Sequence, residues 1–274
     1  MSYENPPLPE DVNVGRDSAL IEFVRLAAGL AVVVVAISAL LYFAGGWLAR
    51  QIPFGIEQAW VGEKAPGIRI ADTPDDTGIE AYVQELSERL ARQMDLPGGM
   101  QLHAHYVDQE VPNAYASLGG HIAVTRGLYQ RLDSENALAL VLAHEIAHIR
   151  ARDPIAGLGG SASMLVVLTL LTGDASSLSG AFASVVQRGY SRHAEALADT
   201  RAIAALHAVY GHAGGGAAVF ETFARYREQH GVEAPSLLST HPLDAERIAR
   251  LRDAAAGWDA QTQPLQVLRI ASPG

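Results

Sequence analysis

The residues of this chain best suited to chemistry form a pentapeptide, His144-Glu145-Ile146-Ala147-His148. On a helix, residues four apart lie on the same face. The two imidazoles can therefore bind one Zn²⁺, and the glutamate after the first can reach a water on that metal. The pattern predicts metal-assisted hydrolysis. The alternative interpretation is two core histidines beside a surface glutamate.

The surrounding sequence favours a helix that carries this pentapeptide. Ser134 can cap the N-terminus of such a helix, and Glu135 suits its first turn because a carboxylate complements the helix dipole. An apolar stretch follows, which predicts that the helix is buried. Asp153-Pro154 is expected to end it.

A catalytic zinc site uses three protein ligands and keeps one open position. Residues 190–199 are expected to form a second helix, on which Glu195 and Asp199 share a face. Glu195 would then bind the metal, while Asp199 accepts a hydrogen bond from a ligand imidazole and fixes its tautomer. A solvated acidic face is the alternative, but the helix is otherwise apolar, and buried carboxylates need partners. Arg247, further along the chain, can pair with Asp199 or another acid.

Four blocks of sequence resemble the HtpX and CAAX-prenyl-protease family of gluzincin metallopeptidases, over about residues 78–254. The blocks are HEIAH, the later YSRHAEALAD, Ser239-Thr240-His241-Pro242 with Arg247, and residues 112–128. In the last block the family usually has Pro-Gly-Gly, and this chain has Leu118 in place of the proline. The departure affects a turn and leaves the metal ligands unchanged.

The resemblance implies a zinc-dependent endopeptidase that hydrolyses protein or peptide substrates, with a role in protein quality control at the membrane. It implies one Zn²⁺ per chain, held by His144, His148 and Glu195, with Glu145 as the general base. It also places His241 near the zinc. There the imidazole can stabilise the oxyanion or fill the open coordination position, and a cap on the following helix is the third interpretation.

Residues 26–49 contain no charged side chain, and Arg25 and Arg50 bracket them. A helix of this length spans about 36 Å, enough to cross the hydrocarbon core of a bilayer. The acidic N-terminus argues against a cleavable signal peptide. We therefore expect a transmembrane anchor in the lipid bilayer, with a buried helix of a soluble protein as the alternative. Resemblance to bacterial single-span relatives implies an inner-membrane protein whose catalytic domain lies on the outer, periplasmic face.

A second apolar stretch, residues 155–171, is not expected to cross the membrane. It lies between His148 and Glu195, and a single crossing would put two ligands of one zinc on opposite sides. We expect a helical hairpin that is buried in the protein or grazes the membrane, with partial insertion as the alternative.

The predicted fold is α+β and mostly helical, a gluzincin-type metalloprotease domain with a small sheet packed on the HExxH helix. Strands are predicted at 100–108 and 121–125, with a turn at Gly119-Gly120 before the second. We expect the second strand at the sheet edge beside the zinc, where a substrate peptide can pair with its backbone. The residues expected to bind substrate are Asn113, Ala114, Gly120, His121, Ile122, Ala123 and Val124.

Two further histidines, His103 and His105, lie two apart in the first predicted strand. The strand period of two places them on the same face of the sheet. They are candidates for a metal pair, and exposed or hydrogen-bonded histidines are the alternative.

Composition narrows the classes of function. The net charge of −10 and the lack of a basic patch argue against a nucleic-acid partner, and the lack of cysteine excludes disulfides and thiolate ligands. The competing hypothesis is a catalytically silent membrane adaptor that holds client proteins on an edge strand, but such a module does not need Glu145. The expected parts are a polar tail (1–20), an anchor (21–50), a connector (51–77), a zinc metallopeptidase domain (78–256) and a C-terminal tail (257–274).

Overall fold

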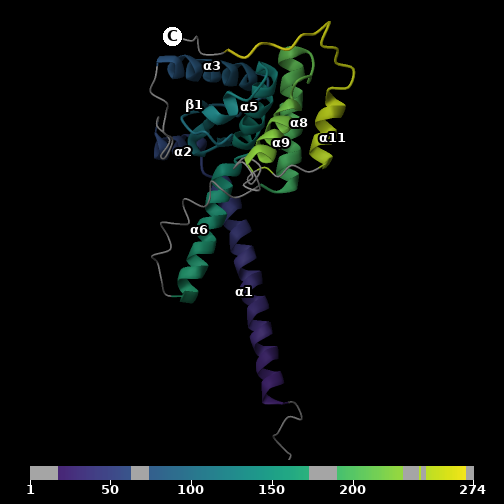
Figure 1. The fold of residues 1–274 in the computed structure, drawn as a ribbon. Helices are drawn as coiled ribbons and strands as arrows, with labels where there is room; N and C mark the ends of the chain where they lie inside the picture. The colour runs from purple at the N-terminus through teal and green to yellow at the C-terminus, as the bar shows by residue number, and fades with distance from the viewer. Residues whose placement is uncertain (1–17, 63–73, 173–189, 231–240, 242–244, 270–274) are drawn as a thin grey trace, which may run out of the picture.

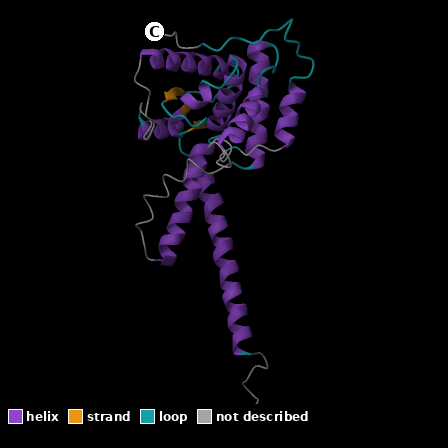
Figure 2. Cartoon of the chain, viewed as in Figure 1, coloured by secondary structure: helices purple, strands orange, loops and turns teal. Residues whose placement is uncertain are grey.

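A helical domain sits at one end of a long helix, α1 (Ala19–Arg50), and a second helix, α6 (Asp153–Thr172), leaves the domain beside it (Figures 1 and 2). The computed structural model describes residues 18–62, 74–172, 190–230, 241 and 245–269. Nearly all of the expected N-terminal tail lies outside these residues. So do residues 63–73 of the expected connector and the last five residues of the expected C-terminal tail.

The domain is mostly helical and contains one small sheet, as predicted. The first part of the expected connector is itself a helix, α2, which packs against the 3-10 turn η1 (Leu118–Gly120). The other helices are α3 (Pro74–Ala91), α4 (Arg126–Tyr129), α5 (Glu135–Arg150), α8 (Arg192–Tyr210), α9 (Ala218–His230) and α11 (Ala245–Ala254), and α2 spans Phe54–Val61.

The centre of the domain is α5, the helix that carries the HExxH pattern. The Ser134 hydroxyl accepts a hydrogen bond from the backbone N–H of Ala137 at 3.3 Å, so the expected N-cap is confirmed. All residues of α5 except Arg150 are buried, and the helix packs against α3, α8 and the sheet. The chain then turns through Arg152, whose φ is +61°, and α6 begins at Asp153.

The sheet has three strands, β1 (His103–Val107), β2 (Ala114–Ala116) and β3 (His121–Thr125), in the order β1–β3–β2. β3 pairs parallel with β1 and antiparallel with β2. The predicted turn before β3 is confirmed, with φ of +72° at Gly119 and +86° at Gly120. A Cβ on Gly120 would lie 2.1 Å from the carbonyl oxygen of Gln101, so only glycine fits there.

The expected edge position of residues 121–125 is wrong, because β3 is the central strand. Its two backbone edges are occupied by β1 and β2, so no substrate can pair with it. All five of its residues are buried, as a central strand requires. The strand at the edge of the sheet against α5 is β2. The expected backbone pairing of a substrate with His121, Ile122, Ala123 and Val124 is therefore wrong. Gly120 and Asn113 lie outside β3 and Ala114 lies in β2, so their contact with substrate stays a prediction.

The histidines of β1 are engaged within the sheet. His105 is buried, and its Nε2 lies 2.8 Å from Nδ1 of His121 while its Nδ1 lies 3.2 Å from a carboxylate oxygen of Glu80. The His103 ring stacks on His121 with 4.9 Å between the ring centroids. His105 is therefore a hydrogen-bonded histidine, which is the alternative given above to a metal pair.

Helices α1 and α6 pack closely and antiparallel. Near the domain Gly46 faces Ala156, and Gly45 faces Gly159, where a Cβ on Gly45 would lie 2.6 Å from the carbonyl oxygen of Gly159. Small residues allow this close approach of two helix backbones. α6 therefore lies against α1 and not inside the domain (Figure 1). Within the described residues, α1 alone is long and apolar enough to cross a membrane.

Candidate metal centre

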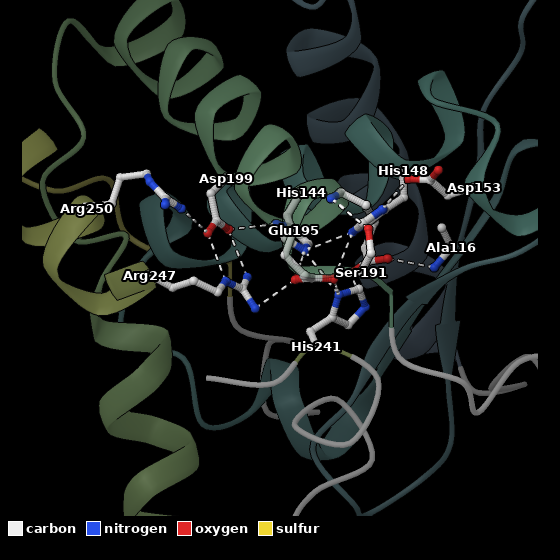
Figure 3. A network of polar contacts seen from close by, with 12 residues as sticks. Ala116, His144, His148, Asp153, Ser191, Glu195, Asp199, His241, Arg247 and Arg250 are labelled. Carbon is white, nitrogen blue, oxygen red and sulfur yellow. Dashed lines mark hydrogen bonds and ion pairs between the residues drawn. The ribbon is translucent and has the colours of Figure 1, made fainter. Parts of the chain in front are cut away.

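Three of the predicted ligands meet in the structure. His144 and His148 come from α5 and Glu195 from α8, and Figure 3 shows their side chains turned toward one another. The Nε2 atoms of the two histidines are 3.2 Å apart, and oxygens of Glu195 lie 3.4 Å and 3.5 Å from them. One ligand atom from each, together with one from His241, lies within 4.8 Å of the others. Buried imidazole and carboxylate ligands in this number fit a zinc ion.

Each of the two histidines is held by a carboxylate on its other ring nitrogen. His144 Nδ1 lies 3.1 Å from Asp199, the residue predicted for this role, and His148 Nδ1 lies 2.9 Å from Asp153. These contacts leave both Nε2 atoms facing the ligand cluster. Asp153 was expected only to end α5. Its contact depends on the turn at Arg152, for which the sequence holds no signal.

Arg247 on α11 connects the two acidic residues of α8. Its Nε and Nη2 each donate to an oxygen of Asp199 at 2.8 Å, and its Nη1 lies 2.7 Å from Glu195. Arg250 adds a contact to Asp199 at 3.2 Å (Figure 3). The predicted pairing of Arg247 with Asp199 is confirmed. A planar guanidinium suits this two-point contact with a carboxylate.

The electrostatics of the cluster favour charged carboxylates. Burial alone would raise the pKa of Glu195, but hydrogen bonds from His144, His148 and His241 outweigh burial and hold that pKa well below its ordinary value. Burial likewise opposes ionisation of Asp199, yet His144 and Arg247 lower its pKa to about 2. Negative ligands and a negative partner for an imidazole are what a divalent cation requires.

Glu145 lies beside the ligands and is 1% exposed. Its Oε2 accepts a hydrogen bond of 2.8 Å from the backbone N–H of Ala116, and its Oε1 lies 3.5 Å from Nε2 of His241. Burial raises the pKa of this carboxyl. A fixed carboxylate with a raised pKa is well suited to accept and release a proton.

His241 lies inside the cluster and is 4% exposed. Its Nδ1 is 2.9 Å from an oxygen of Glu195 and 3.2 Å from Nε2 of His144. The proposed helix cap at Pro242 lies outside the described residues. Tyr190, which the sequence reading did not single out, stacks on His148 with 4.0 Å between ring centroids.

A pocket of about 420 Å³, part of which is open to solvent, lies beside the cluster. Apolar side chains of α5 and α9 form most of its wall, and the polar lining includes His144, Glu145 and His241. The apolar lining consists of Leu140, Val141, Val219, Phe220 and Phe223. The arrangement can hold an apolar side chain close to the cluster.

Comparison with known proteins finds one family. Residues 79–255 match the family model of peptidase family M48. The Protease HtpX homolog of Desulforapulum autotrophicum is 29% identical over 228 residues, covering 66% of this chain and 70% of that protein. The Beta-barrel assembly-enhancing protease of Escherichia coli is 25% identical over 201 residues, covering 66% of this chain and 40% of that protein. The matched part of the chain thus spans two fifths or less of the length of the beta-barrel assembly-enhancing proteases.

Proposed function

The chain belongs to peptidase family M48, and we propose that it is a membrane-anchored, zinc-dependent endopeptidase. The observation that carries this proposal is the convergence of His144, His148 and Glu195 around one point, with the carboxylate of Glu145 beside it. We assign one Zn²⁺ per chain to these three ligands.

Each residue of the site has its own role in peptide hydrolysis. Bound Zn²⁺ supplies a Lewis acid that lowers the pKa of a water and polarises the scissile carbonyl. Ala116 holds one oxygen of Glu145, which leaves the other to take the proton of the attacking water and pass it to the leaving amine. Asp199 and Asp153 keep His144 and His148 in orientation.

We propose that the substrate backbone pairs with the edge strand β2. Asn113 and Ser117, which flank β2, form backbone hydrogen bonds with β3. Successive residues of an antiparallel strand direct their backbone N–H and C=O groups to opposite sides, so those of Ala114 and Ala116 face away from β3. The bond from Ala116 to Glu145 supports this direction. A peptide on this side would lie next to the general base, and the neighbouring apolar pocket would receive an apolar side chain.

We propose that α1 spans the bilayer and that α6 enters it. Leu30, Val35 and Leu40 of α1 are each at least 66% exposed, which suits lipid and not water. α6 runs back along α1 from its domain end, so a bilayer that surrounds α1 also surrounds α6. Leu170, near the end of α6, is 80% exposed. This placement corresponds to the partial insertion considered above for residues 155–171.

We further propose an inner-membrane location with the domain on the outer face, and a role in protein quality control at the membrane. The long apolar helix α1 supports a membrane location, and the similarity to bacterial proteases named HtpX homolog is consistent with the inner membrane expected from the resemblance. In the structure the ligand-bearing end of α5 lies where α1 and α6 meet the domain, so the metal centre would lie close to the bilayer surface. Such a position suits cleavage of membrane-proximal segments of protein substrates.

The decisive experiment uses the full chain purified in lipid nanodiscs with casein as substrate. Glu145→Gln should keep the fold and the zinc and lose about 10²–10⁴ in kcat, because the amide cannot accept a proton. Glu110→Gln, which changes an exposed glutamate in the same way, is the matched control. Proteolysis by Glu145→Gln at the rate of the control would refute the proposed function.

A further inference from the structure

The last residue of α1 contacts the outer partner of a metal-ligand histidine. Asp153 lies between His148 and Arg50: its Oδ2 is 2.9 Å from Nδ1 of His148, and its Oδ1 accepts a hydrogen bond of 3.0 Å from Nη2 of Arg50. Asp153 is 7% exposed and His148 fully buried. The carboxylate therefore has little access to water and depends on these two partners.

The other histidine also contacts a carboxylate that is bound by an arginine, but that arginine comes from a different helix. His144 is held by Asp199, and Asp199 by Arg247 from α11, a helix of the domain. On the second histidine the arginine belongs to the long apolar helix α1. Both imidazoles thus have a carboxylate fixed by a guanidinium, and one of the two guanidinium groups comes from the anchor.

Further contacts fix the end of α1 at this place. Arg152, just before α6, donates to the carbonyl oxygen of Ile52 at 2.6 Å and lies 2.9 Å from Glu57 of α2. Glu57 also accepts a hydrogen bond of 2.7 Å from the backbone N–H of Gly119, so the chain after α1 contacts both the turn between α5 and α6 and the 3-10 turn η1 before β3. The close approach of α1 and α6 at Gly46 leaves Arg50 beside the first turn of α6.

We propose that Arg50 and Asp153 are positioning residues of the metal centre. The helix α1 then helps to orient a metal ligand in addition to anchoring the chain. Asp153 orients His148, and Arg50 holds the Asp153 carboxylate in place. Loosening of α1 from α6 then weakens zinc binding through His148. The inference rests on the proposed zinc function for the identity of the metal, and its test measures metal affinity without substrate.

The test compares zinc affinity in full-length variants in nanodiscs by competition with a chelating indicator. Asp153→Asn should lower the affinity about 10- to 100-fold, the usual effect of removing an outer partner of a ligand histidine. Arg50→Gln should lower it about two- to fivefold, as expected for a half-exposed ion pair. Arg50→Lys should restore most of the loss. The matched control is Arg92→Gln, which removes an exposed arginine just after the end of α3.

A double-mutant cycle separates positioning from general damage to the fold. If Arg50 acts through Asp153, Arg50→Gln should add no further loss of affinity in the Asp153→Asn background. Equal zinc affinity in Arg50→Gln and wild type, or losses that simply add, would overturn the inference. A chain that shows the expected order of affinities and yet cleaves no casein would instead contradict the proposed function alone.

Discussion

Arg247 lies 2.7 Å from Glu195, so a permanently charged guanidinium sits directly behind the carboxylate proposed to bind zinc. The same side chain holds Asp199 through two bonds, and all three residues are buried. Asp199 and Arg247 are 48 residues apart in the chain, yet this one side chain contacts both acids of α8. The contact makes α11 part of the metal centre.

Arg247→Gln should therefore destabilise the domain by about 3–5 kcal/mol, because two buried carboxylates lose their buried cation and only Asp199 keeps a contact, with the partly exposed Arg250. Thermal and denaturant unfolding of the zinc-free chain measure this loss. Arg252→Gln, an exposed change on the same helix, should have little effect. Equal stability of the two variants would show that Arg247 does not compensate the acids.

Glu195→Ala should lower zinc affinity by more than the roughly 10- to 100-fold typical of an outer partner, since a direct ligand is lost. Zinc content after dialysis against a weak chelator provides the measurement. Glu221→Ala, on the exposed face of α9, serves as control. One tightly held zinc per chain in Glu195→Ala would exclude this residue as a ligand.

His241→Ala should raise the rate of proteolysis. Nδ1 of His241 lies among the ligand atoms, so with three ligands already present the imidazole is placed to fill the fourth position. The readouts are kcat on casein and zinc content. A fall in kcat of about 10²–10³ with zinc retained would instead identify His241 as the oxyanion donor.

Whether α6 lies in the bilayer can be measured with a dye on a single introduced cysteine, because the chain has no cysteine of its own. A polarity-sensitive dye on Leu170→Cys should emit at shorter wavelength in liposomes and be quenched by nitroxide-labelled lipids. The control is Val267→Cys, because Val267 is equally apolar and is 82% exposed on the domain. A dye at position 170 that reports water, like the one at 267, would place α6 outside the bilayer.

The hydrogen bonds around Glu135, which lies away from the metal centre, predict that the free energy of unfolding falls at acid pH. Burial opposes ionisation of Glu135, but hydrogen bonds from Tyr82, Arg89 and Tyr210 lower its pKa overall. A lowered pKa stabilises the fold above the ordinary pKa of about 4.3, and this contribution is lost as the pH falls through the folded-state value.

Glu135→Gln should accordingly cost about 1.5–3 kcal/mol at pH 7, the range for a hydrogen bond to a charged group. The difference from wild type should shrink as the pH drops below 4. Denaturant unfolding of both proteins between pH 7 and pH 3 tests the slope, with the exposed Glu85→Gln as control. A difference that stays constant with pH would rule out the charge of Glu135 as its cause.

Local patterns were enough to predict the elements that carry the site. The spacing of His144 and His148 predicts one face of a helix, and the capping by Ser134 follows from residue type alone. The length of the uncharged stretch in α1 likewise predicts a helix of membrane-spanning length. These features depend on periodicity and propensity within a few turns of chain, which a sequence shows directly.

Contacts between residues far apart in the chain could not be predicted from these local patterns. Strand β3 was expected at the sheet edge and lies at its centre, because strand order depends on which backbones meet, and the side-chain pattern of a single strand does not record this. The contact of Asp153 with His148 depends on one left-handed turn at Arg152.

The sequence by itself thus predicted the reaction class and the ligand types and determined the long apolar helix, since each follows from residues close together in the chain. Only the tertiary structure decided that Arg50 and Arg247, from opposite ends of the chain, hold the carboxylates behind the two ligand histidines. Buried charges must find partners wherever the fold brings them within a few ångströms, and that distance is a property of packing, not of sequence spacing.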